Sequence, residues 1–498
     1  SATPGYYYID IGHPNATDAG NINGYPNKPR LSIPTNLAAG SYVEIHSTNN
    51  IAYTGTSITI NVSGTASNPV WVRGESPSSR PNIQVRIAIT GSYAIFENLY
   101  IYRTDRDGAI GFGPGSNHVS VRGCEMEGTG TNVGFGSVIS PTGTPGNNVS
   151  HIVLYNNEIH AWGDESASVE NDLHGVKPAR NADYIWILNN HIYDLGGDSV
   201  QVGDASVPTA DQSTYIYIGV NIFHDNMENA VDIKKSAHII ISQNTCYNYY
   251  AGPFSSGEGI VIHNGPDYVW AIYNKVYNCT IGIITTGSTN TYFIGNVIYN
   301  IHGSPPSDNF AGISHRGGGT LYIVNNTIYD VDTGIQVSSG VNPTIISNNI
   351  ISLVTSSLYH VRVDDTVSAG GSDLTYTIMH NPDGMARIYW GSSPTRNLAS
   401  FSTAFPNEGV GCSEADPLFE NPSLGDFRVK TGSPAIDNGY ANSSYTTFLN
   451  LYGINISMDL YGTPRPTNVN WDVGAYEYPG VAPPPTLVPG PPTNLIIS

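Results

Sequence analysis

The feature that most constrains the fold is a short phrase of alternating apolar and polar residues that recurs along the chain. Three copies are Gly175–Lys177, Ser199–Val202 and Ala230–Ile233, each opening on a small residue. Alternation with a period of two predicts β-strands, because successive side chains of a strand point to opposite faces. A strand phrase that returns about every 20 to 35 residues predicts a solenoid, in which each repeat forms one rung and contacts only its neighbours.

A column of asparagines supports the same fold. Aligning the Asn that precedes an apolar or aromatic pair gives Asn157, Asn190, Asn221, Asn244, Asn274, Asn296, Asn326 and Asn348, at spacings of 33, 31, 23, 30, 22, 30 and 22 residues. An Asn at one bend of successive rungs can bond its neighbours above and below, and so satisfy buried backbone groups. Cys124 occupies this column one rung earlier. The longer spacings predict extra loop residues on one side, where solenoids usually build their binding face.

Composition narrows the class of protein. The chain has 498 residues, of which 54 are Gly and only 12% are charged, as expected for strands joined by many turns. Its 20 Lys and Arg residues stand against 40 Asp and Glu residues, which argues against a nucleic-acid partner and favours an extracellular protein. No apolar stretch reaches the length of about 18 residues that predicts a membrane span. The start at Ser1 is typical of a mature secreted or cell-surface protein.

The pattern divides the chain into four segments. Residues 1–85 are expected to form N-terminal lead-in strands and a cap, and residues 86–365 the main solenoid. Residues 366–479 are expected to add C-terminal rungs and a capping segment, since an open rung edge invites aggregation. Residues 480–498 read as a Pro-rich linker whose end resembles the first strand of a fibronectin type III module. Fibronectin type III or anchoring modules are therefore expected in a longer natural protein.

The outward positions of the strand phrase form two columns along one sheet. The first column reads Lys177, Gln201, Asp232, Val261, Ile284, Ser314 and Gln336, and the second reads Ala179, Gly203, Lys234, His263, Thr286, Arg316 and Ser338. The chain has six lysines, and three of them, Lys177, Lys234 and Lys235, fall on two rungs of this sheet, with Arg180 close by. Such a cluster in an acidic chain indicates a functional face. The alternative is a strand face that Lys and Arg simply solvate.

Carboxylates accompany these basic residues. Asp198 and Glu228 lie at the turn that enters the sheet, as does His174, while Asp232 is on a strand and Asp204 follows one. Carboxylates on adjacent rungs, about 4.8 Å apart, repel one another unless a proton or a hard cation lies between them. Two interpretations follow: either Ca²⁺ binds here, or one carboxyl group is held protonated as a general acid. The plainer alternative is that turn carboxylates accept backbone N–H bonds.

The repeat, the asparagine column and the mixed basic and acidic face resemble secreted bacterial proteins of the pectate-lyase-like superfamily. The resemblance implies an all-β, right-handed parallel β-helix of about ten rungs with capped ends. Residues 229–236, NAVDIKKS, are similar to strand phrases of polysaccharide lyase families six and nine. This similarity implies that Lys234 or Lys235 is the catalytic base and that Asp232 and Glu228 are Ca²⁺ ligands. The paired aspartates of family nine are absent, because GGDSVQVGD supplies its two aspartates separately.

These observations predict an extracellular polysaccharide lyase that cleaves a uronate-containing glycan by β-elimination. The reaction removes the proton next to a carboxylate, so it needs a positive group on that carboxylate and a base with a lowered pKa. Lysines close to other cations would have such a pKa. The predicted catalytic residues are Lys177, Arg180, Lys234, Lys235 and His263; the predicted substrate-binding residues are His174, Trp186, Gln201 and Arg316; the predicted Ca²⁺ ligands are Asp198, Asp204, Glu228 and Asp232.

Two other classes of function fit the same face. An inverting glycoside hydrolase needs two carboxyl groups about 6.5–9.5 Å apart, which Asp198 and Asp232 can supply. A non-catalytic carbohydrate-binding or adhesin solenoid would rely on aromatic platforms, for which Trp162, Trp186 and Trp270 are candidates. Tyrosines that recur at one repeat position are instead expected to form a stacked structural row, namely Tyr193, Tyr277, Tyr299 and Tyr329.

Overall fold

The computed structural model describes residues 5–164, 166–169, 171–392 and 394–479. The chain forms two compact units, residues 1–237 and residues 238–498, and each is described by itself. The linker predicted at residues 480–498 lies outside the described residues. In the described part of the chain, no helix is long and apolar enough to cross a membrane.

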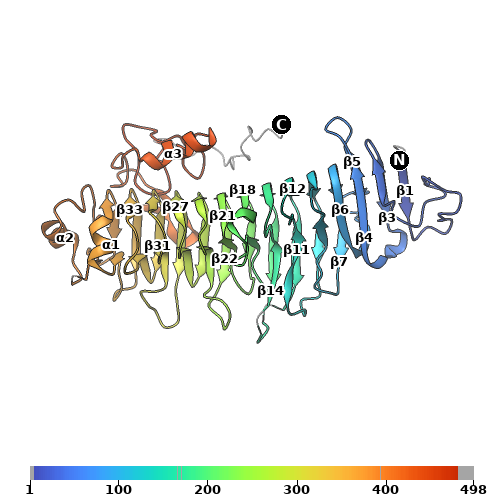
Figure 1. Cartoon of the computed structure of the whole chain (residues 1–498). Helices are drawn as coiled ribbons and strands as arrows, with labels where there is room; N and C mark the ends of the chain where they lie inside the picture. The colour runs from blue at the N-terminus through green and yellow to red at the C-terminus, as the bar shows by residue number, and fades with distance from the viewer. Residues whose placement is uncertain (1–4, 165, 170, 393, 480–498) are drawn as a thin grey trace. The chain divides into compact units, whose positions relative to one another are not determined.

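The first unit consists of strands that pair in parallel in three stacks, which we call sheets A, B and C (Figure 1). Sheet A contains β8 (Ile110–Phe112), β11 (Phe135–Ser140), β14 (Asp172–Val176), β17 (Val200–Val202) and β20 (Val231–Lys234). Sheet B contains β1 (Tyr6–Asp10), β3 (Tyr42–His46), β5 (Val70–Gly74), β9 (Asn117–Arg122), β12 (Val149–Tyr155), β15 (Ala182–Leu188) and β18 (Ser213–Gly219). Sheet C contains β7 (Tyr100–Tyr102), β10 (Glu125–Glu127), β13 (Glu158–Trp162), β16 (His191–Leu195) and β19 (Ile222–His224). The long β6 (Asn82–Glu97) joins all three, and β2 (Asn36–Ala38), β4 (Tyr53–Ser63) and the 3-10 turns η1 (Thr48–Asn50) and η2 (Thr209–Asp211) complete this unit.

The second unit repeats the three sheets, and β21 (Ser236–Ser242) leads into it. Its sheet A contains β23 (Glu258–His263), β26 (Ile281–Thr285), β29 (Ala311–His315), β32 (Thr333–Val337), β35 (Val361–Val363) and β38 (Ile388–Trp390). Its sheet B contains β24 (Asp267–Ile272), β27 (Thr289–Ile294), β30 (Leu321–Val324), β33 (Thr344–Ser347) and β36 (Asp373–Thr375). Its sheet C contains β22 (Thr245–Tyr249), β25 (Lys275–Cys279), β28 (Val297–Ile301), β31 (Thr327–Val331), β34 (Ile350–Val354) and β37 (Ile378–His380). The other elements are α1 (Thr366–Gly371), α2 (Leu398–Ala404), β39 (Phe419–Asn421), η3 (Pro422–Leu424), β40 (Asp426–Val429) and α3 (Ser443–Tyr452).

One rung of the first unit shows how the sequence winds. The chain passes through β14, β15 and β16 and begins the next rung with β17, which pairs in parallel with β14. In the same way β18 pairs with β15, and β19 pairs with β16. A crossover between parallel strands turns right-handed in nearly all proteins. Each unit is a right-handed parallel β-helix, as predicted, and parallel pairing already includes β1 and β3 within residues 1–85.

The alternating phrase points its apolar residues into the core. Val176, Val200 and Val231 lie in register on consecutive rungs of sheet A and are fully buried. Ile185 and Ile216 do the same on sheet B. Burying one such side chain contributes about 1.5–3 kcal/mol, so the stacking of like residues is a main source of stability.

The asparagine column forms a hydrogen-bonded ladder in the first unit. Nδ2 of Asn157 donates to Oδ1 of Asn190 at 2.9 Å, and Nδ2 of Asn190 donates to Oδ1 of Asn221 at 3.0 Å. The backbone N–H groups of Asn157 and Asn190 bond the same oxygens. Cys124 starts the ladder, since its N–H donates to Oδ1 of Asn157 at 3.1 Å. The ladder therefore satisfies backbone groups at a buried bend, as predicted.

The second unit continues this arrangement with one correction to the prediction. Its ladder consists of Asn244, Asn274, Asn296, Asn326 and Asn349. The prediction of Asn348 as the last member is wrong by one residue. The residue before each ladder position has a left-handed backbone, and Asn348 is such a residue, with φ of 55°. Two asparagines are consecutive here, so only the backbone conformation decides which of them joins the ladder.

Aromatic side chains form a stacked row on the outer face of sheet C, as predicted for Tyr193, Tyr277 and Tyr299. Tyr329, also predicted for this row, instead makes a tilted contact with Phe427 and an edge contact with Phe419. In the first unit Tyr193 stacks between His160 and His224, with ring centroids 5.1 and 5.0 Å apart. In the second unit Tyr277 stacks on Tyr299 at 4.8 Å. Rings stacked along the rung direction present their edges to solvent. The row therefore supports the stack and offers few ring faces to a sugar.

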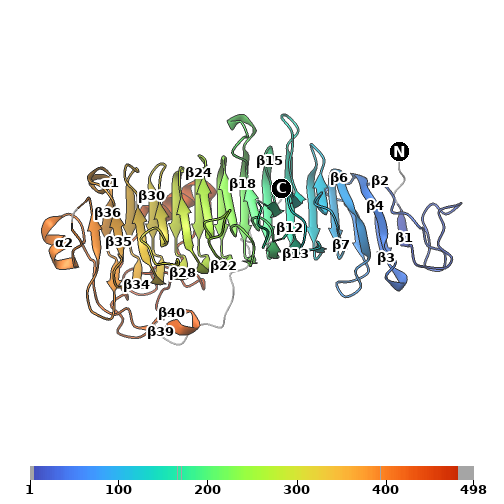
Figure 2. The same cartoon turned by 90° about the horizontal axis from the view of Figure 1, so that it is seen from below.

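The C-terminal segment covers two parts of the second unit. At α2, Phe401 packs against Trp390 of β38, the last strand of sheet A, with ring centroids 5.5 Å apart. Further along, α3 lies beside the strands, and its Phe448 packs against Trp270 of β24 at 4.9 Å (Figure 1). The antiparallel pair β39 and β40 lies beside sheet C, where Phe427 packs against Tyr299 of β28 and Tyr329 of β31 with ring centroids 5.1 and 5.2 Å apart (Figure 2). The segment around α2 therefore covers the end of the stack, and the rest covers its side.

Replacing Asn296 by Ala should destabilise the second unit. Its Oδ1 accepts bonds from the backbone and the side chain of Asn274, and its Nδ2 donates to the Ala271 carbonyl. Each buried group left unpaired costs about 1–3 kcal/mol, so Asn296→Ala should lower the free energy of unfolding by about 2–4 kcal/mol. Urea denaturation followed by circular dichroism measures the change. Asn309→Ala, at an exposed loop position, is the control and should change it by less than about 0.5 kcal/mol. Equal losses in the two variants would contradict the structural role of the ladder.

Candidate active site

Sheet A of the first unit brings the predicted outward residues together. Gln201 of β17 lies in register with Asp232 of β20. The pairing of Val176 with Val200 places Lys177 one rung before Gln201. Adjacent strands are about 4.8 Å apart, so the three side chains of this column are neighbours.

Three residues meet where the chain enters this sheet. Metal-ligating atoms of His174, Asp198 and Glu228 all lie within 4.8 Å of one another. His174 and Asp198 are fully buried, and Glu228 is half-buried. We call these three residues the acidic cluster. The sequence placed all three at the turn that enters the sheet and predicted Asp198 and Glu228 as Ca²⁺ ligands, and the structure brings the three together.

Hydrogen bonds fix the orientation of the acidic cluster. The backbone N–H of Asp198 donates to Nδ1 of His174 at 3.1 Å. Oδ1 of Asp198 accepts bonds from the backbone and side chain of Asn229 at 3.1 and 2.9 Å. Oδ2 of Asp198 lies 3.2 Å from Nδ1 of His174, but within the described residues neither this oxygen nor Nε2 of His174 makes a hydrogen bond. A buried carboxylate oxygen in that state is costly, which points to a proton or a cation at the cluster.

The carboxyl group of Glu228 is strongly perturbed. Burial raises the pKa of Glu228 to about 10, and the nearby carboxylates of Asp198, Asp172 and Asp232 add to the rise. Lys234 acts in the opposite direction. Glu228 is therefore protonated at neutral pH unless a cation neutralises the cluster. A protonated Glu228 is a proton donor, whereas an ionised Glu228 beside a bound cation is a ligand of that cation.

The two lysines of the outward columns are paired with carboxylates. Nζ of Lys234 lies 2.8 Å from Oδ2 of Asp232, and Nζ of Lys177 lies 3.9 Å from Oδ2 of Asp204. The expectation of a lowered pKa for Lys234 is wrong. Burial lowers its pKa, but Asp232 and the carboxylates of the acidic cluster outweigh burial and raise the pKa overall. Neighbouring cations would lower the pKa of a lysine, but the charged neighbours of Lys234 are carboxylates, which raise it.

Three other predicted residues have different surroundings. Lys235 follows β20, and its Nζ donates to the Val207 carbonyl at 3.3 Å. Arg180 is exposed in the loop before β15. Trp186 belongs to β15 in sheet B and is only 9% exposed. Its ring therefore offers no open face on which a sugar could stack.

The predicted residues of the second unit lie on that unit's own sheet A. His263 ends β23, and Arg316 follows β29. The guanidinium of Arg316 donates to the Asn309 carbonyl and, at 3.4 Å, to Oε1 of Gln336. Burial lowers the pKa of Arg316 and Glu258 opposes that shift. An arginine stays charged under such shifts, so Arg316 supplies a fixed cation on this face.

The donors of the acidic cluster can be compared with the needs of Ca²⁺. This ion prefers about six to eight oxygen ligands. Asp198 offers a buried oxygen without a hydrogen-bond partner in the described structure, and Glu228 offers a second carboxylate. The two carboxylates are hard oxygen donors but supply only part of that number, so a bound Ca²⁺ would need further oxygens from water, and His174 adds one nitrogen donor. The predicted ligand Asp204 has other partners, since it accepts bonds from the backbone and hydroxyl of Ser206 at 2.8 and 2.6 Å.

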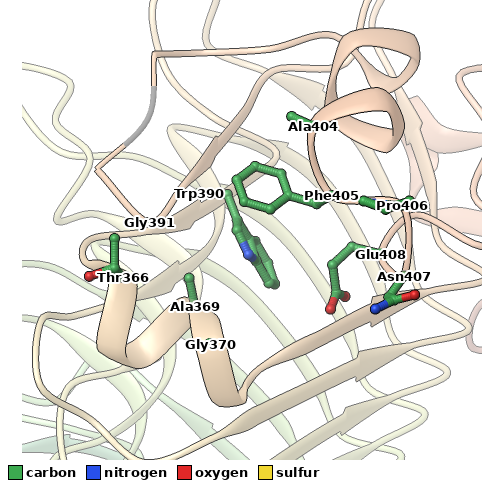
Figure 3. Close-up of a pocket in the computed structure, with 10 residues that line it drawn as sticks. All are labelled: Thr366, Ala369, Gly370, Trp390, Gly391, Ala404, Phe405, Pro406, Asn407 and Glu408. Carbon is green, nitrogen blue, oxygen red and sulfur yellow. The ribbon is translucent and has the colours of Figure 1, made fainter.

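A cavity in the second unit gave no signal in the sequence patterns. It measures about 360 Å³ and lies between α1, β38 and the loop after α2 (Figure 3). Its lining consists of Thr366, Ala369, Gly370, Trp390, Gly391, Ala404, Phe405, Pro406, Asn407 and Glu408. Burial raises the pKa of Glu408, whose Oε2 accepts the Leu374 N–H at 2.8 Å. None of these lining residues belongs to the predicted site, because they come from loops and short helices outside the strand repeat.

Comparison with known families supports the fold. A family model described as a right handed beta helix region matches residues 209–374. Among curated proteins, no sequence matches this chain significantly.

Several solved structures are similar to this chain at low identity. A GH136 lacto-N-biosidase from Eubacterium ramulus is 13% identical, with 77% of this chain and 67% of that chain covered and a TM-score of 0.47. The Dettilon tailspike protein is 13% identical, with 67% and 62% covered and a TM-score of 0.43. The pectate lyase Pel9A is 14% identical, with 96% and 97% covered and a TM-score of 0.34. The chain thus spans less than two thirds of the length of the tailspike protein.

Glu228→Gln should stabilise the metal-free protein, because it removes a carboxyl group that is buried beside like charges. The pKa of Glu228 is raised from 4.5 to about 10, so the folded state keeps a proton that the unfolded state loses as pH rises. The free energy of unfolding of the wild type therefore decreases as pH rises from 4.5 towards about 10, whereas a Gln side chain does not titrate and causes no such decrease. The gain should reach about 1–4 kcal/mol near neutral pH and grow from about pH 5 to about pH 8.

Urea denaturation in EDTA measures this gain. The control is Glu420→Gln, an exposed carboxylate in the C-terminal segment, which should show no such pH trend. A gain for Glu228→Gln that does not vary with pH would contradict the raised pKa.

Proposed function

We propose that this chain is an extracellular glycan-degrading enzyme, a polysaccharide lyase that cleaves a uronate-containing glycan by β-elimination. The observation that carries the proposal is the position of Lys234 beside the acidic cluster, on one sheet of the first unit. The glycan would lie along sheet A, where Lys177 and Gln201 occupy the preceding rungs. The ammonium group of Lys177 and the side-chain amide of Gln201 can both bind the carboxylates of an acidic polymer.

The proposed reaction needs one proton to be moved twice. Elimination breaks the C–H bond next to the uronate carboxylate and the C–O bond to the neighbouring sugar, and it forms a C=C bond. Neutral Lys234 would take the first proton, and the resulting ammonium would return it to the leaving oxygen. Carboxylates raise the pKa of Lys234, so it can act as a base only after their charge is neutralised.

Ca²⁺ is the cation that we propose for that purpose. Held by Asp198 and Glu228, it would neutralise the acidic cluster and pair with the uronate carboxylate. The protein's own part is to hold these carboxylates in fixed register. Their position on stacked strands leaves little to reorganise when substrate binds.

A glycoside hydrolase on the same face is the second candidate. The raised pKa of Glu228 favours it, because a protonated carboxyl group is what a general acid requires. However, the ligand atoms of Asp198 and Glu228 lie within 4.8 Å, which is closer than the separation of about 6.5–9.5 Å that inversion needs. This pair is therefore too close for inversion, and the carboxyl pair of an inverting hydrolase would be Asp198 with Asp232.

Lys234→Ala should lower kcat by about 10²–10⁴, the usual contribution of a general base. Lys234→Arg keeps the positive charge but supplies no base at neutral pH, so it should be equally inactive. Lys28→Ala, an exposed lysine of the same unit, is the matched control and should keep full activity. The assay follows the ultraviolet absorbance of unsaturated uronate ends on pectate, alginate, glycosaminoglycans and ulvan.

The same assay separates the three classes of function. New reducing ends without ultraviolet absorbance would show hydrolysis and reject the lyase. Glycan binding without any product would leave a non-catalytic carbohydrate-binding protein. Full activity in Lys234→Arg would assign this residue to substrate binding instead of proton transfer.

A further inference from the structure

Sheet C of the first unit carries a second group of titratable side chains on its outer face. Glu125 and Glu127 of β10 lie in register with Glu158 and His160 of β13. His191 of β16 continues the column of Glu125 and Glu158. Residues two apart on a strand share a face, so all five side chains belong to one surface.

Three of these side chains converge on one point. An oxygen of Glu125, an oxygen of Glu127 and a ring nitrogen of His160 all lie within 4.8 Å of one another. Nε2 of His160 is 3.7 Å from Oε1 of Glu125. Ligands bonded at about 2.0–2.1 Å to a tetrahedral ion are themselves about 3–4 Å apart, so the spacing is close to what coordination needs. The three residues are half-buried, which leaves them open to an ion from solvent.

Each of these side chains is also held by a partner outside the trio. Nη1 of Arg80 donates to Oε2 of Glu125 at 2.7 Å. The hydroxyl of Tyr100 donates to Oε2 of Glu127 at 2.6 Å. The histidine ring stacks on Tyr193 with an interplanar angle of 6°. Such outer contacts orient metal ligands and leave one donor atom of each side chain pointing inward.

The donor chemistry selects the kind of ion. Two carboxylates and one imidazole make three mixed ligands on a half-exposed surface, and three such ligands with an open fourth position are common for Zn²⁺. We propose that Glu125, Glu127 and His160 bind a Zn²⁺ ion on the outer face of sheet C. This site shares no residue with the acidic cluster, and its existence does not depend on the lyase reaction.

A neighbouring histidine pair provides the matched control. Nε2 of His191 lies 2.7 Å from Nε2 of His224, and Nδ1 of His224 lies 2.6 Å from Oδ2 of Asp225. These distances are those of hydrogen bonds, which engage the facing ring nitrogens with each other. His191 is therefore a histidine on the same face, one rung away from His160, but outside the proposed ligand set.

The test is isothermal titration of ZnCl₂ into the EDTA-treated and dialysed protein. The number of Zn²⁺ ions bound per chain should fall by one in His160→Gln and in Glu127→Gln, and it should be unchanged in His191→Gln. Circular dichroism of each variant confirms that it is folded, which is expected for polar-to-polar changes at half-buried positions. Co²⁺ gives a second readout, because its visible absorption reports the loss of a nitrogen ligand.

The outcomes separate this proposal from the lyase. Equal Zn²⁺ stoichiometry in the wild type and His160→Gln would overturn the zinc site. A loss in His191→Gln would also overturn it, because the ion would then be held by the histidine pair. Glycan cleavage by His160→Gln at the wild-type rate is compatible with the zinc site, and loss of activity in Lys234→Ala says nothing against it.

Discussion

The hydrogen bond from one asparagine side chain to the next is the interaction on which the faces of this molecule depend. Without it, the bend before each sheet C strand would leave polar backbone groups buried and unpaired. With it, Asn157 and Asn190 hold their rungs in a single register, and the residues that follow them, Glu158 and His191, are aligned as a consequence. Side chains far apart in sequence thus become neighbours at a fixed spacing of about 4.8 Å.

That spacing also sets the electrostatics of the protein. Like charges in one column cannot move apart, because the backbone fixes the distance between them. On sheet A the conflict is buried, and it appears as the raised pKa of Glu228. On sheet C the column of Glu125 and Glu158 is half-exposed, and Arg80 and Tyr193 donate hydrogen bonds to these two glutamates. Arrangements that cost stability in the empty protein are those that a bound proton, ion or substrate relieves, which is why they mark functional faces.

Much of the fold could be predicted because the alternation of apolar and polar residues and the spacing of the ladder asparagines can be read directly from the sequence. The column of Lys177, Gln201 and Asp232 followed from this periodicity alone. What periodicity does not contain is the partner of each side chain, so the ion pair that raises the Lys234 pKa was missed, although Asp232 lies only two residues away. The rung loops also hide which sheet a residue joins, as Trp186 shows. The carboxylates of sheet C were not predicted as a site, because the sequence prediction considered only the outward residues of sheet A.

The left-handed residue before each ladder asparagine has a consequence for how such a chain can evolve. It makes every bend the same local structure, whether 22 residues or 33 separate it from the next bend. Insertions in one rung, such as the segment between β17 and β18, are therefore mechanically isolated from the rungs on either side. Natural selection can lengthen or replace a surface loop without re-registering the core. In this fold the bends supply stability and can stay the same, while the loops can change and so alter which ligands are bound.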